Sequence, residues 1–72
     1  MQPEFEINKK FGEHLKKLRE AKGTSLNMLA YENDLNKSTL SRIENGLVDP
    51  KLSTLYKIAN SLEISLDELM KF

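Results

Sequence analysis

Helix-ending and helix-capping residues recur along this sequence, and the stretches between them carry apolar residues at helical spacing. Phe11, Leu15 and Leu18 fall at positions i, i+4 and i+7, which places all three on one face of a helix. Gly23 and Gly46 each follow such a stretch, at the position where glycine commonly ends a helix. The sequence therefore predicts an all-α fold, a compact bundle of five short helices.

The expected helices are bounded by recognisable end signals. Ser25, Asn36 and Ser65 are of the residue types that accept hydrogen bonds from the first free N–H groups of a helix. Ser65 and Glu68 also have the spacing of a capping box. The five predicted helices cover residues 9–22, 26–32, 37–45, 52–62 and a short stretch after residue 65.

Residues 1–8 are expected to form an N-terminal arm in front of a domain at 9–72. Residues 4–7 alternate charged and apolar side chains, which is a weak strand pattern. A frayed end with one apolar side chain on the core is the favoured interpretation. Asn8 would then cap the first helix.

Size and composition restrict the function. A chain of 72 residues forms one domain with a small core. Without cysteine it has no disulfide framework, which fits the reducing cytoplasm. No apolar run approaches the ~18 residues of a membrane helix. The 11 basic residues are balanced by 11 acidic ones, so any basic face for nucleic acid must be local.

Nothing in the sequence suggests catalysis. His14 is the only histidine, and with no cysteine beside it we expect a surface role and no metal site. No pair of carboxylates and no nucleophile with a base is placed for chemistry. We therefore expect a protein that is not an enzyme and needs no cofactor.

Residues 25–45 have the pattern of a helix-turn-helix, with the turn at Asn33-Asp34-Leu35-Asn36. Ala30 is small where the two helices must approach each other closely. The second of these helices carries a polar outer face, made of Lys37, Ser38, Thr39, Ser41 and Arg42. Lysine and arginine suit the O6 and N7 atoms of guanine, and serine and threonine are permissive.

Several stretches in order resemble phage-repressor and Cro/C1-type helix-turn-helix transcriptional regulators, the xenobiotic-response-element (XRE) family. The resemblance covers about residues 9–70. The stretches that carry it are Phe11–Arg19, Leu29-Ala30, Ser38–Gly46, Pro50, Leu55, Ala59–Leu62 and Ser65–Leu69. It implies a bundle whose third helix lies in the major groove of double-stranded DNA, acting as a homodimer on a palindromic site.

The resemblance also assigns roles to single residues. It implies base contacts by Lys37, Ser38 and Arg42, and flanking or phosphate contacts by Ser25, Asn36, Thr39, Ser41 and Asn45. Arg19 and Glu44 match a structural salt bridge between the first and third helices. Leu66, Met70 and Phe72 could cover the core or form a dimer interface, and the interface is favoured because the family commonly dimerises through this region.

Three positions depart from the family pattern, and each weakens the expected anchoring on DNA. Leu26 stands where a phosphate-binding glutamine is usual, and Asp34 replaces the usual turn glycine. Asp49, in the loop after Leu47 and Val48, would repel a phosphate. A second hypothesis is therefore a protein-interaction module of the same fold, such as an antitoxin or adaptor with weak or no DNA binding.

Met28 and Tyr31, beside Leu26, could serve such a module. If exposed, they would form a small apolar patch on the second helix, as interfaces often do. Equally, Tyr31 could pack over the core with its hydroxyl in water. The sequence leaves both possibilities open.

Overall fold

The computed structural model describes the backbone of residues 3–72 and the side chains from Glu6 onward. Its helices are α1 (Pro3–Lys22), α2 (Leu26–Glu32), α3 (Lys37–Glu44), α4 (Leu52–Ser61) and α5 (Leu66–Leu69). Between residues 3 and 72 there is no strand. The predicted all-α bundle is confirmed, and the predicted bounds of α2 to α5 differ from the observed ones by about one residue.

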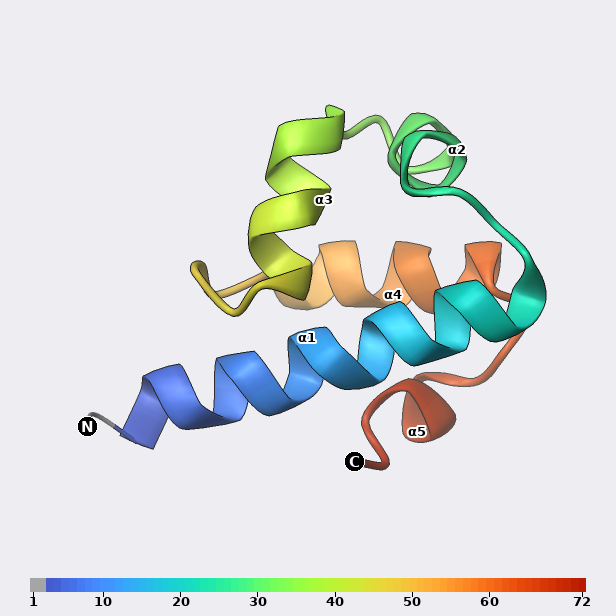
Figure 1. Ribbon diagram of the computed structural model, residues 1–72. Helices are drawn as coiled ribbons and strands as arrows, with labels where there is room; N and C mark the ends of the chain where they lie inside the picture. Colours follow the sequence, from blue (N-terminus) through green and yellow to red (C-terminus); the bar gives the residue numbers. More distant parts are fainter. Residues whose placement is uncertain (1–2) are drawn as a thin grey trace.

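The short helices surround one small core. In Figure 1, α1 runs across the molecule, α2 and α3 lie together on one side of it, and α4 passes behind. The turn of α5 lies near the C-terminal half of α1. The buried apolar side chains come from all five helices and their ends: Phe11, Leu15, Leu29, Ala30, Leu40, Ile43, Leu55, Ile58, Ala59, Leu62 and Leu69.

Four of the helices end in the same way. After α1, the Gly23 N–H donates to the Glu20 carbonyl at 3.0 Å and the Thr24 N–H to the Arg19 carbonyl at 3.1 Å. This is a Schellman motif, which requires a left-handed residue after the helix. The left-handed residues after α1, α2, α3 and α4 are Gly23, Asp34, Gly46 and Glu63. Asp34 adopts the conformation expected of a turn glycine, whereas Glu63 was not foreseen.

The expected start of the first helix at Lys9 is wrong. Helix α1 begins at Pro3, so residues 3–8 belong to the helix and do not form an arm. Met1 and Gln2 lie outside the described residues. Asn8 therefore does not cap a helix. Its amide Nδ2 donates instead to the Asp49 carboxylate at 2.6 Å, tying the N-terminal part of α1 to the loop before α4.

The backbone of helix α1 is in close contact with the backbone at the C-terminal end of α3. Gly12 is buried there, and a Cβ atom on it would lie 2.3 Å from the Glu44 carbonyl oxygen. Real Cβ atoms do not come so close to a carbonyl oxygen, so only glycine allows this crossing. The contact fixes where α3 stands on the rest of the bundle. No helix within residues 3–72 is long and apolar enough to cross a membrane.

Candidate nucleic-acid interface

Local hydrogen bonds shape the helix-turn-helix. Ser25 accepts a hydrogen bond from the Met28 N–H at 3.0 Å and caps α2 as predicted from the sequence. Asn33 ends α2 and is buried, with its Nδ2 donating to the Leu29 carbonyl at 2.8 Å. Asp34 turns the chain with φ 55°. Leu35 packs against the core, and α3 starts two residues later.

Helix α3 has one buried face and one exposed face. Leu40, Ile43 and Glu44 are buried against the bundle. The outer side chains are a separate set: Lys37, Ser38, Arg42 and Asn45 are exposed, and Thr39 and Ser41 are half-buried. Apart from Ser25 at the start of α2, the residues expected to contact DNA thus lie together along the outside of α3 and at its two ends.

The two asparagines at the ends of α3 are held by local contacts. The Oδ1 atom of Asn36 accepts hydrogen bonds from the Thr39 N–H at 2.8 Å and from the Ser38 hydroxyl at 2.9 Å. The Nδ2 group of Asn45 donates to the Ser41 carbonyl at 2.8 Å and approaches its hydroxyl at 3.3 Å. Asn36 is therefore an N-cap and Asn45 a C-cap as well as candidate contact residues.

Lys37 and Arg42 are the two cationic residues of α3. Neither forms an ion pair with any residue between Glu6 and Phe72, whereas Arg19 and Lys22 do. Their charges are exposed on the outer side of α3 and available to an anionic partner. The interface therefore carries two uncommitted positive charges.

Arg19 and Glu44 join α1 to α3 by a two-pronged ion pair. The Nε and Nη2 groups of Arg19 donate to the two Glu44 carboxylate oxygens at 2.7 and 3.1 Å. Nη1 donates to the Thr24 carbonyl at 3.0 Å. The hydrogen bond to Glu44 raises the pKa of Arg19, against the opposing effect of burial. The side chains are only 11% and 6% exposed, so the pair faces the bundle interior and not the outer face of α3.

The lysines of α1 do not form a basic face of their own. Glu6, Glu13 and Glu20 recur every seven residues along the exposed side of α1, between the lysines. Side chains three or four residues apart are neighbours on a helix, so these carboxylates offset part of the positive charge of α1, although none forms an ion pair with a lysine among the described residues. The exposed side of α1 therefore carries mixed charges and no uniformly basic face. Helix α3 remains the best candidate surface for an anion.

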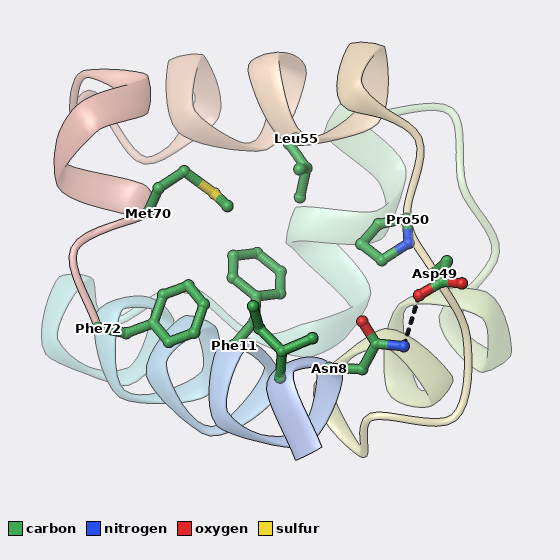
Figure 2. A pocket seen from close by; sticks show the side chains of 8 residues that line it. Asn8, Phe11, Asp49, Pro50, Leu55, Met70 and Phe72 are labelled. Atoms are coloured by element: carbon green, nitrogen blue, oxygen red, sulfur yellow. Dashed lines mark hydrogen bonds between the residues drawn. The ribbon is translucent and has the colours of Figure 1, made fainter. Parts of the chain in front are cut away.

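The side chains proposed for dimerisation lie beside an open apolar pocket. Phe72 packs its ring edge-to-face on Phe11, with centroids 5.7 Å apart at 62°, and remains 47% exposed. Met70 is 42% exposed, whereas Leu66 is half-buried against the core. Figure 2 shows Met70, Phe72 and Phe11 around this pocket of about 170 Å³.

Two features around this pocket were missed from the sequence. The Asn8–Asp49 hydrogen bond closes one side of the pocket in Figure 2. His14 lies beside Phe72, and its Nε2 atom is 3.2 Å from the Glu68 carbonyl oxygen. The partners are 41 and 54 residues apart, so no local pattern reveals them. Between Glu6 and Phe72 no group of histidines and carboxylates could hold a metal ion.

Comparison with known proteins decides the family. The model of a family described as helix-turn-helix (HTH_3) matches residues 15–69, which is most of the chain. The chain belongs to this helix-turn-helix family. The resemblance inferred from the sequence is thereby confirmed.

Relatives of this helix-turn-helix protein occur in Bacillus subtilis (strain 168). The HTH-type transcriptional regulator SlrR is 41% identical over 59 residues, which cover 81% of this chain and 39% of SlrR. The HTH-type transcriptional repressor RghR is 41% identical over 61 residues, covering 83% of this chain and 45% of RghR. The chain thus spans less than half the length of these two relatives.

Solved structures share the fold over nearly the whole chain. The restriction-modification controller protein C.AhdI from Aeromonas hydrophila has a TM-score of 0.89 and 34% identity, covering 94% of this chain and 99% of C.AhdI. The clp gene regulator ClgR from Corynebacterium glutamicum has a TM-score of 0.86 at 23% identity, over 89% of this chain and 68% of ClgR. The second likeness shows the fold alone.

Proposed function

We propose that this helix-turn-helix protein is a sequence-specific transcriptional regulator that binds double-stranded DNA with α3 in the major groove. The observation that carries the proposal is the outer face of α3, which presents Lys37 and Arg42, without ion-pair partners among residues 6–72, beside the hydroxyls of Ser38 and Ser41. The major groove admits one α-helix, and such side chains reach base edges and phosphates there.

The exposed positions divide by the contacts they would make. Lys37, Ser38 and Arg42 would contact bases. Thr39 and Ser41 would contact the flanking backbone. The remaining expected contacts, to phosphates, come from the ends of α2 and α3: Ser25, Asn36 and Asn45. These contacts would position α3 without selecting a sequence.

The relatives' names favour a regulator of repressor or controller type. RghR is named a transcriptional repressor and C.AhdI a controller protein. We propose that this chain acts similarly in the cytoplasm, as a homodimer on a palindromic operator. A twofold dimer would place two α3 helices on half-sites about one helical turn of DNA apart. The exposed Met70 and Phe72 supply apolar surface for that dimer.

Electrostatic anchoring is expected to be modest. Two uncommitted cations on α3 give few phosphate neutralisations per protomer, and Asp49 lies in the loop between α3 and α4. Because log K falls with log salt by about 0.9 for each phosphate neutralised, the salt dependence should be shallow for a monomer. A dimer should double that slope.

Iterative selection from random double-stranded DNA tests the function. We expect an enriched palindrome whose affinity, followed by fluorescence anisotropy, falls as salt rises. Arg42→Ala should lower the affinity, with the helical circular dichroism unchanged. A folded protein that enriches no sequence at low salt would refute the proposal.

A protein-interaction module is the second candidate, and the exposed side chains of α2 favour it. Tyr31 is 80% exposed and Met28 is also exposed, so Tyr31 does not pack over the core. Leu47 adds an exposed apolar side chain in the α3–α4 loop. A stable complex with another protein, lost on Tyr31→Ala, together with no detectable DNA affinity would select this candidate.

A further inference from the structure

We infer that the half-site is read chiefly at a guanine, by Arg42, and that no side-chain amide of α3 reads adenine. The inference rests on the proposed function and names the base on which its sequence preference depends. Three observations carry it: the place of Arg42 on α3, the hydrogen bonds of the two asparagines, and the ion pair of Glu44.

Arg42 lies on the exposed face, in the last turn of α3. Ser38 and Arg42 are four residues apart and therefore neighbours on one side of the helix. The buried residues Leu40, Ile43 and Glu44 occupy the opposite side. A guanidinium presents parallel N–H groups that match the O6 and N7 acceptors of guanine. Because Arg42 has no ion-pair partner among residues 6–72, this fork is free to bind.

An adenine reader needs both ends of one amide. Asparagine and glutamine read adenine by accepting from N6 and donating to N7 together. In Asn36 the oxygen already accepts from the Thr39 N–H and the Ser38 hydroxyl. In Asn45 the amino group, which has two hydrogens, already donates to both the carbonyl and the hydroxyl oxygen of Ser41.

The orientation of each amide is fixed by the backbone. Only an oxygen can accept from the Thr39 N–H, and only an amino group can donate to the Ser41 carbonyl. Turning either amide toward a base would therefore break a helix cap. Residues 37–44 contain no other asparagine or glutamine, so α3 lacks an uncommitted amide.

No carboxylate of α3 is available to read cytosine. Glu44 is its only acidic residue, and both carboxylate oxygens are bound by Arg19. Ser38 donates its hydroxyl hydrogen to Asn36, so it offers lone pairs to the amino group of either cytosine or adenine. Ser38 does not distinguish these two bases, and the discrimination depends on the cations.

Atom-level changes in the selected DNA site test the inference. Each guanine of a half-site is replaced in turn by 7-deazaguanine, and each adenine by 7-deazaadenine, which removes only the N7 acceptor. We expect one guanine position to weaken binding by about 3- to 12-fold, because one of the two hydrogen bonds of a bidentate contact is lost while the bond to O6 remains. Every adenine replacement should change the affinity by less than about twofold, because no bidentate contact is lost there.

Arg42→Ala assigns the effect to Arg42. Alanine removes the guanidinium donors, so the variant should lose the sensitivity to 7-deazaguanine, whereas Arg42→Lys, whose ammonium group can also donate to guanine, should keep part of it. Lys17→Ala, on the exposed side of α1, is the matched control and should keep that sensitivity.

The outcomes separate this inference from the proposed function. Binding that is weakened mainly by 7-deazaadenine, or a guanine effect that survives in Arg42→Ala, would overturn the guanine inference and leave DNA binding intact. Failure of the folded protein to enrich any DNA would overturn the proposed function, and the guanine inference with it.

Discussion

Two side chains stand where the backbone favours glycine. Asp34 and Glu63 have φ angles of 55° and 59° and complete the Schellman motifs after α2 and α4. A left-handed conformation costs an ordinary L-residue about 1–2 kcal/mol, and less for aspartate, whose side chain tolerates it. The cost at Glu63 is therefore the larger of the two, and glycine should remove it.

Replacing Glu63 by glycine should stabilise the protein. The side chain is exposed and its main contact is with Lys22, so Glu63→Ala removes that contact but keeps the backbone strain. Glu63→Gly should be more stable than Glu63→Ala by about 1 kcal/mol in urea denaturation. Equal stability of the two variants would show that the left-handed backbone is not strained.

Single residues also mark the limit of sequence-based prediction. Ser25, Asn36 and Ser65 were predicted as caps because a cap bonds to an N–H only three residues away. Asn33 shows no such signal. Its burial and its Oδ1 atom, which has no hydrogen-bond partner in the described chain, depend on packing around the turn.

At the scale of elements, the crossing of α1 and α3 positions the proposed reading face. Gly12 allows the close backbone approach, and the Arg19–Glu44 pair fixes the two helices a little further along α1. Both are contacts between segments distant in sequence. The Arg19–Glu44 pair entered the expectations only through a family resemblance, and the Gly12 contact was not foreseen.

Adding one methyl group at this crossing should be costly. In Gly12→Ala the new Cβ would meet the Glu44 carbonyl group, so α1 and α3 must separate. We expect a loss of about 1–3 kcal/mol in the free energy of unfolding, as for other overpacked sites, measured by chemical denaturation. Ala21→Gly, on the exposed side of the same helix, controls for helix propensity and should cost about 1 kcal/mol. A Gly12→Ala variant as stable as the parent would refute the close contact.

Removing one partner of the buried ion pair should also destabilise the fold. Arg19→Met leaves the Glu44 carboxylate buried without its cation, at an expected cost of about 3–5 kcal/mol. Arg19→Met combined with Glu44→Leu should recover part of the loss, because no charge is then stranded. Additive effects of the two substitutions in thermal or urea unfolding would argue against a direct coupling.

The start of α1 shows why element boundaries can fail. Pro3 is acceptable at the first position of a helix, since its missing N–H would have no helical partner there. The alternation in residues 4–7 and the apparent cap at Asn8 suggested otherwise. The partner of Asn8 is Asp49, and that long-range contact is absent from any local pattern.

For the molecule as a whole, balanced charge conceals an uneven arrangement. Equal numbers of acidic and basic residues give no net charge, which alone argues against DNA binding. Among residues 6–72 only Arg19 and Lys22 form ion pairs with glutamates, and the exposed Lys37 and Arg42 place two unpaired positive charges on the outer face of α3. The fold class followed from local signals, whereas this division of charges required the tertiary structure.

Stability of the whole molecule should weaken in acid partly through Glu63. Its pKa is lowered below the ordinary value of 4.5 by the hydrogen bond from Lys22. A lowered pKa means that the contact stabilises the protein above that value and is lost as the pH falls below it. The stability difference between the parent and Glu63→Gln, measured by urea midpoints, should therefore shrink steadily as the pH is lowered from neutral to below 4.5. A difference that persists in acid would assign the effect to something other than this charge.

The two faces of α3 have a consequence for how such a protein can change. Leu40, Ile43 and Glu44 hold the helix to the bundle, while Lys37, Ser38 and Arg42 contribute nothing to the core. Substitutions on the outer set can accumulate with little loss of stability. The scaffold is therefore suited to divergence after gene duplication, in which copies keep one architecture and acquire different targets.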